Sequence, residues 1–148
     1  MQITSRFTIA VHVLTAIEYF KDMDRVNSEF LAGSVGVNPV IVRNVISMLR
    51  SAGLVKTQRG SSGAKLAKGL DEITFYDVYI AVDSVDENEG LFHFHEHPNT
   101  DCPVGRNIHK AMGERLTDVQ KAMEEELKKT TLADISEDIL KELDMEAE

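Results

Sequence analysis

The sequence predicts a mainly α-helical fold with a small β-hairpin, and three observations lead to this prediction. Apolar residues recur at helical spacing in residues 5–49 and again, over a longer stretch, in residues 106–129. Between these stretches, residues 54–59 and 64–68 flank a glycine-containing turn, as the two strands of a hairpin do. A chain of 148 residues, of which 43% are hydrophobic, is long enough for one domain or for a small domain with an extension.

The first two predicted helices are short, and each has its own start signal. The first covers residues 5–17, with Ser5 or Thr4 as its cap. Its apolar face is expected to contain Phe7, Val11, Leu14 and Ile17. After a polar turn, Asn27 is expected to cap a second helix that ends at Gly36.

The third predicted helix has two faces of different character. Asn38 offers an N-cap oxygen, and Pro39 takes the first helical position, where its missing N–H costs nothing. The buried stripe is expected to consist of Val42, Val45, Ile46 and Leu49. The residues that point away from this stripe are Arg43, Asn44, Ser47 and Arg50.

The second half of the chain contains one long amphipathic helix. Residues 73–85 have helical spacing with Thr74 as a cap, and residues 86–101 show no clear periodicity. The long helix covers residues 106–129, and its apolar stripe is Ile108, Met112, Leu116, Val119, Met123 and Leu127. A final helix over residues 132–143 is too short to cover that stripe, so we expect two copies of the chain to associate through it.

Three helices followed by a two-stranded wing form a winged helix-turn-helix. The sequence therefore predicts a winged helix-turn-helix domain at residues 1–85 and a variable or sensor loop at residues 86–105. A dimerisation helix with a C-terminal tail is predicted for residues 106–148.

Charge is divided unevenly along the chain. The net charge of −9 by itself disfavours a nucleic-acid partner. Residues 1–70, however, hold nine lysines and arginines against four acidic residues, whereas residues 71–148 hold seven against twenty-one. Residues 30–70 contain six cationic residues and no acidic one. Because DNA binding depends on local cations near phosphates, this distribution predicts double-stranded DNA as a partner of the N-terminal half.

In a winged helix-turn-helix, the second helix of the pair enters the major groove and reads base edges with its N-terminal residues. Here the candidates are Asn38, Pro39, Val40, Ile41, Arg43 and Asn44. Asparagine can pair with adenine, arginine with guanine, and valine or isoleucine can touch a thymine methyl group. The wing tip offers Arg59, Ser61, Ser62 and Gly63 for phosphate or minor-groove contacts. Ser5 and Arg6 can hold a phosphate at the N-terminus of the first helix.

Four segments together resemble one known family. They are Ser5-Arg6-Phe7-Thr8-Ile9-Ala10, Asn38-Pro39-Val40-Ile41-Val42-Arg43, Gly53-Leu54-Val55 with the glycine-rich wing, and Ile73-Thr74-Phe75-Tyr76-Asp77-Val78-Tyr79. Over nearly the whole chain the sequence resembles the Rrf-two family of winged helix-turn-helix transcription regulators, and residues 91–92, 97–99 and 102–105 are similar to its YwnA-like subgroup. The resemblance implies a homodimer on a palindromic operator that represses or activates transcription, with repression favoured.

The cysteine content departs from the family pattern. Members that hold an iron–sulfur cluster use three cysteines in the loop before the long helix, whereas this chain has only Cys102. One thiolate cannot hold such a cluster, which takes about four soft ligands per site. We therefore expect neither an iron–sulfur cluster nor another cofactor. A lone cysteine, together with apolar runs far shorter than the ~20 residues of a membrane span, favours a reducing, cytoplasmic location.

Two interpretations of Cys102 remain open. It precedes Pro103 at the predicted start of a helix, where the helix dipole and free N–H groups stabilise a thiolate and lower its pKa. It can then serve as a thiol redox sensor, through a mixed disulfide or a bond between subunits. Alternatively, it is a small residue packed at a helix start.

Other functions are also consistent with parts of the sequence. His93, His95 and His97 alternate, so an extended segment would point all three the same way, toward zinc or copper with help from Cys102 or His109. A solvated loop, on which the three side chains never converge, is the favoured alternative. A winged helix can also serve as a protein-interaction module. An enzyme is not expected, because the sequence has no phosphate-binding glycine loop and no nucleophile elbow.

Overall fold

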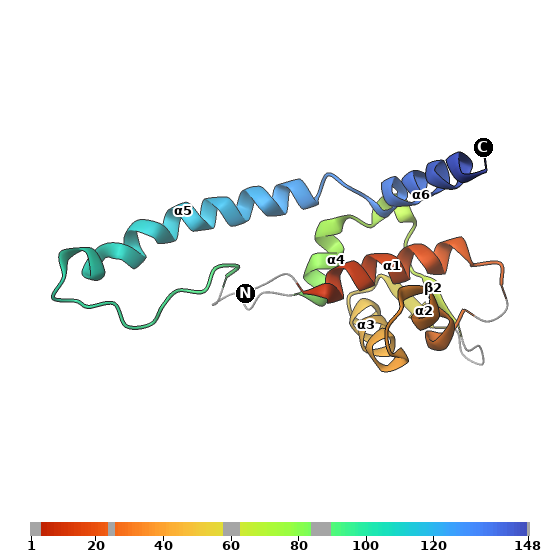
Figure 1. Cartoon of the computed structure of the whole chain (residues 1–148), viewed down its shortest axis with the longest axis horizontal. Coiled ribbons are helices and arrows are strands. Elements are labelled where there is room, and N and C mark those ends of the chain that lie inside the picture. Colours follow the sequence, from red (N-terminus) through yellow and green to blue (C-terminus); the bar gives the residue numbers. More distant parts are fainter. Residues whose placement is uncertain (1–3, 24–25, 58–62, 84–89, 148) are drawn as a thin grey trace.

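The computed structural model describes residues 4–23, 26–57, 63–83 and 90–147 (Figure 1). Within these ranges the chain forms six α-helices, one short 3-10 helix and a two-stranded antiparallel sheet, so the predicted fold class is confirmed. In chain order the elements are α1 (Ser5–Tyr19), α2 (Ser28–Val35), α3 (Pro39–Ser51), β1 (Val55–Thr57), β2 (Ala64–Leu66), η1 (Leu70–Glu72), α4 (Phe75–Val82), α5 (Pro103–Leu127) and α6 (Leu132–Glu146).

Side-chain caps fix where the first three helices begin. Thr4 caps α1, and its hydroxyl accepts a hydrogen bond from the backbone N–H of Arg6. Asn27 caps α2, and Asn38 caps α3 by accepting the N–H of Val40 at 2.9 Å. Gly36 ends α2 with φ of 84°, a conformation that glycine adopts without strain. These caps confirm the predicted helix starts.

The hydrophobic core surrounds α1, which contacts α2, α3, α4, α6 and β2. Residues 13–17 of α1 are all buried, whereas Phe7 and Val11 are only partly covered. Both residues nevertheless pack against this core, so the apolar face predicted for the helix is present. The buried run at residues 13–17 is wider than one stripe because a helix packed on several sides buries a continuous run of residues near its centre. The predicted buried stripe of α3 is confirmed, from Val42 to Leu49.

The wing is a short hairpin next to α3. Val55 pairs with Leu66 and Thr57 with Ala64, in antiparallel register. Leu54 and Val55 are buried in the core and anchor the hairpin to the helices. The predicted wing tip at residues 58–62 lies outside the described residues.

The C-terminal helices begin and end at slightly different residues from those predicted. Thr74 and Asp77 form a capping box, so α4 starts at Phe75, one residue after the cap. Pro103 occupies the first turn of α5, which therefore begins three residues before the predicted start. α6 continues to Glu146 rather than ending at residue 143.

α6 packs against the winged-helix unit, which consists of α1–α4 and the β1–β2 wing. The backbone N–H of Leu132 donates to the carbonyl of Ile73 at 2.9 Å, and the N–H of Phe75 donates to the carbonyl of Thr130 at 2.9 Å. Leu132 is fully buried in the same core as Leu14. Figure 1 shows α6 on the side of α1 opposite α2 and α3. The predicted C-terminal region, residues 106–148, thus contains most of α5, none of which is buried, and α6, which packs on α1 and η1.

α5 extends away from the winged-helix unit as one long rod (Figure 1). None of its residues is buried, and α4 is the element that it contacts most. Among the described residues, no single helix is long and apolar enough to cross a membrane. Taken together, α2 and α3 are long and apolar enough by length and composition alone, but the chain bends by 109° between them.

Candidate nucleic-acid interface

The exposed face of α3 carries an uncommon mixture of side chains. Val40 is 52% exposed and Ile41 is 40% exposed, although both are branched hydrophobic residues. Arg43 and Asn44 are exposed beside them, and the buried stripe of α3 lies on the opposite side of the helix. The first two turns of α3 therefore offer a thymine-methyl contact surface, a guanine-pairing group and an adenine-pairing group within one patch.

Asn38 and Pro39 have structural tasks at the start of this helix. The Oδ1 atom of Asn38 already accepts the N–H of Val40, which leaves the amide N–H groups of its side chain for a ligand. Pro39 is partly buried at the first helical position. Asn38 can therefore donate to a base or phosphate while it caps α3, whereas bidentate pairing with adenine would cost the cap.

The N-terminus of α1 is occupied by groups of the chain itself. The hydroxyl of Thr4 donates to Oδ1 of Asp83 at 2.6 Å, and the same hydroxyl accepts the N–H and the Nε–H of Arg6. Arg6 Nη2 lies 3.7 Å from that carboxylate oxygen. Because a buried carboxylate already faces this helix end, the backbone N–H groups alone make a weaker phosphate site than predicted. Arg6, which is about half exposed, remains a candidate contact.

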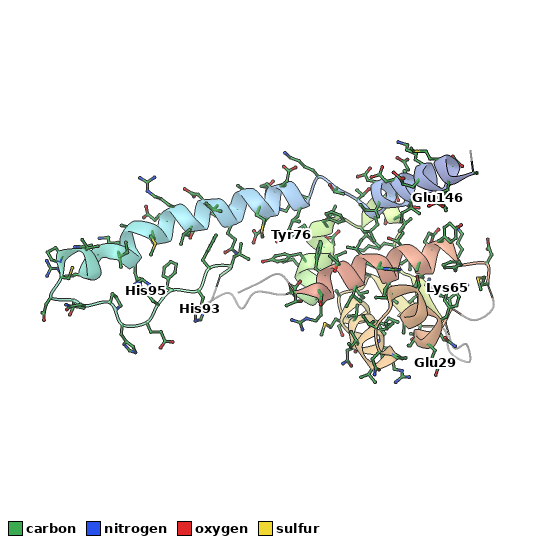
Figure 2. The ribbon with its side chains drawn as sticks, viewed as in Figure 1. Glu29, Lys65, Tyr76, His93, His95 and Glu146 are labelled. Carbon is green, nitrogen blue, oxygen red and sulfur yellow. The ribbon has the colours of Figure 1, made fainter. Side chains whose placement is uncertain are left out.

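Two wing lysines form a cationic pair that the sequence analysis did not single out. Lys56 on β1 and Lys65 on β2 lie directly opposite each other in the register, and both are exposed. Like charges at directly opposed positions destabilise a hairpin unless an anion lies between or beside them. Figure 2 shows Lys65 on the same part of the molecule as α3. The pairing depends on the strand register, which places residues nine apart side by side.

Gly63 lies immediately before β2, whereas Arg59, Ser61 and Ser62 lie outside the described residues. The structure therefore brings the α3 candidates together on one face and provides two further cations on the wing. It does not describe the wing tip.

Cys102 stands at the start of α5, as predicted. It occupies the N-cap position without a regular side-chain cap hydrogen bond, yet the backbone N–H groups of Gly105 and then Val104 lower the pKa of its thiol. The preceding turn is tight, because a Cβ atom on Gly105 would collide with the carbonyl oxygen of Asn99. The geometry therefore favours a partly exposed, thiolate-prone cysteine at a helix start.

The three alternating histidines do not converge. His93, His95 and His97 are all exposed. The ring of His95 packs edge-on against that of His109, with 4.8 Å between the ring centroids. No group of three histidine, cysteine or acidic side chains suited to a metal ion occurs in the described parts of the chain. Figure 2 shows His93 and His95 on the segment that runs alongside α5. This segment and α5 enclose an open cleft of about 860 Å³, with His93 and His109 among its lining residues.

Comparison with known proteins agrees with this geometry. The model of the Rrf2 family, described as an iron-dependent transcriptional regulator, matches residues 3–138. YwnA of Bacillus subtilis (strain 168), named as a candidate HTH-type transcriptional regulator, is 42% identical over 134 residues, which cover 90% of this chain and 96% of that protein.

Two solved structures extend the comparison. A crystal structure of a candidate DNA-binding protein is 37% identical and superposes with a TM-score of 0.71, over 88% of this chain and 98% of the other. CymR, the global cysteine regulator of B. subtilis, shares the fold with a TM-score of 0.66 at 20% identity, over 93% of this chain and 97% of CymR. The order of the elements, the exposed face of α3 and the family match together show that this chain belongs to the Rrf2 family of transcriptional regulators.

Proposed function

We propose that this protein is a sequence-specific DNA-binding regulator that inserts α3 into the major groove of a palindromic operator. The observation that carries the proposal is the exposed face of α3. There Val40 and Ile41 stand 52% and 40% exposed beside Arg43 and Asn44. The lack of acidic residues from 30 to 70 and the lysine pair of the wing supply the cationic surroundings that DNA phosphates need. Such a protein acts on the chromosome in the cytoplasm.

We propose further that the protein acts as a homodimer through α5. This helix has 25 residues and none of them is buried, although an apolar stripe runs along it. The segment at residues 90–94 contacts one side of α5, where the N–H of Leu91 donates to Oε1 of Gln120, and α4 also contacts this helix. Val119 is left 52% exposed. A second copy of α5 is the partner that would cover this stripe. Two copies would then present two α3 helices to half-sites about one DNA turn apart.

Arg43 and Arg59 are expected to contribute in different ways. Arg43→Ala should relax base preference, costing about 1–3 kcal/mol on the preferred operator and little on unrelated DNA. Arg59→Ala should weaken binding to all sequences alike and reduce the log–log salt slope by about one. Fluorescence anisotropy with operator and scrambled duplexes measures both effects. If both variants bind as the wild type does, the contacts lie elsewhere.

We propose repression as the mode of regulation and the Cys102 thiol as a redox-responsive group. The redox role is supported by the position of Cys102 at the N-terminus of α5, where the N–H groups of Gly105 and Val104 lower the pKa of the thiol. When the rate of alkylation of Cys102 is plotted against pH, the midpoint for the folded protein should lie at a lower pH than the midpoint for the denatured chain. Above this midpoint the thiolate, which is the reactive form, predominates. Diamide should change DNA binding of the wild type, whereas Cys102→Ser should not respond. An equal response of both proteins would remove this role from Cys102.

The family is described as iron-dependent, but the residues of this chain do not fit an iron–sulfur cluster. An iron–sulfur cluster takes about four soft ligands, and this chain offers one thiolate. We therefore propose a regulator without such a cluster. A metal-responsive regulator that uses His93, His95 and His97 is the second candidate, but the absence of a metal-suited cluster in the described part of the chain disfavours it. Equilibrium dialysis with zinc distinguishes the two, because retention of zinc at micromolar concentration would support the second.

A protein-interaction module is the remaining alternative. The discriminating measurement is the salt dependence of binding. DNA affinity should fall steeply with salt, because each neutralised phosphate releases counterions. A contact made by the apolar stripe of α5 with another protein should depend little on salt.

A further inference from the structure

Asp83, at the end of α4, is a buried carboxylate that the proposed DNA contacts do not include. Its side chain is 1% exposed, and its Oδ1 accepts the hydroxyl of Thr4 at 2.6 Å. Its Oδ2 has no hydrogen-bond partner within the described residues. Removing a carboxylate this completely from water costs desolvation free energy. A carboxylate in such a position therefore needs a compensating cation nearby or serves a function.

The compensating cation is Arg6, which is held at two points. Its Nε–H donates to the hydroxyl of Thr4 at 3.2 Å, and its Nη2 lies 3.7 Å from Oδ1 of Asp83. A guanidinium group has five N–H donors in a rigid plane, so these two contacts orient the plane and leave other donors free. The side chain is 46% exposed. A ligand that approaches from solvent therefore meets the arginine before it meets the carboxylate beneath.

On the basis of the proposed DNA-binding function, we infer that Asp83 is a positioning residue that orients Arg6 toward a phosphate of the DNA backbone. Thr4 transmits this constraint, because its hydroxyl touches both partners and also caps α1. The contact joins residues 79 apart in the chain. It fixes the N-terminus of α1 to the end of α4, which is where the chain leaves the winged-helix unit.

The test is a double-mutant cycle on operator binding with Asp83→Asn and Arg6→Ala, together with the combined variant. Each single variant should bind the operator about tenfold more weakly, the loss expected for one charged hydrogen bond. Each should also lower the log–log salt slope by about one. The combined variant should lose no more than Arg6→Ala alone. Glu72→Gln is the matched control, because it removes a carboxylate at an exposed position of the same unit and should bind as the wild type does.

Several outcomes would overturn the inference. Tighter binding by Asp83→Asn would mean that Asp83 neutralises Arg6 instead of orienting it. A loss that persists in full in the Arg6→Ala background would mean that Asp83 acts through the fold alone. If Asp83→Asn does not fold, as circular dichroism would reveal, Arg6→Lys provides the second test. It keeps the charge but lacks the planar donors, and wild-type affinity for this variant would contradict orientation by Asp83. Failure of the wild type to bind DNA would instead contradict the proposed function itself.

Discussion

Val119→Asp is expected to convert the proposed dimer into a monomer and to weaken operator binding by about a hundredfold or more, because the two half-sites would no longer be bound together. Val119 lies in the apolar stripe of α5 and is 52% exposed in the single chain. A charge there leaves the fold of one chain intact but would be buried without a partner in a dimer. Light scattering gives the mass, and anisotropy gives the affinity.

Thr117→Asp is the matched control for this substitution. It adds the same charge on the same helix, at an exposed position about 160° away around the helix axis. This variant should stay dimeric and bind DNA as the wild type does. If Val119→Asp remains a dimer, or if the wild type itself is a monomer, the proposed role of α5 is wrong.

Leu132→Ala is expected to lower the free energy of unfolding by about 2–5 kcal/mol, the range for emptying a fully buried leucine site. Leu132 is fully buried where α6 meets η1 and α1, and its N–H donates to Ile73. The loss would therefore show that α6 belongs to the cooperative core of the winged-helix unit. Urea unfolding followed by circular dichroism measures this free energy.

Leu140→Ala, on the same helix, is the control for the packing argument. Leu140 is 48% exposed, so the same loss of atoms should cost under about 1 kcal/mol. Equal costs at the two positions would mean that α6 is not packed on the unit in solution.

Features that depend on neighbouring residues could be predicted from the sequence. The caps at Asn27 and Asn38 and the two faces of α3 follow from residue types within one or two helical turns, and the structure has them where they were expected. Cys102 at the start of α5 is of the same kind, because Pro103 marks a first helical turn. These local signals were sufficient to place the proposed DNA-contacting face.

Features that depend on distant residues could not be predicted. The contact of Asp83 with Arg6 joins residues separated by about half of the chain. The opposed lysines of the wing depend on a strand register that composition does not reveal. The same limit applies to α6, whose amphipathic pattern marks an apolar face but does not reveal that α1 is the partner of that face. For the three histidines the sequence left a metal site and a solvated loop open, because an alternating pattern aligns side chains only in an extended strand, and residues 90–101 form no strand.

The most direct test of the central claim is binding of the purified protein to the promoter DNA upstream of its own gene, measured over a range of salt concentrations. We expect a dimer to bind this duplex in preference to a scrambled one. We also expect the affinity to fall as about the third power of the salt concentration or more steeply, as counterion release at several phosphates requires. Equal binding to both duplexes, or binding that salt does not weaken, would show that the protein is not a sequence-specific DNA-binding regulator of this kind.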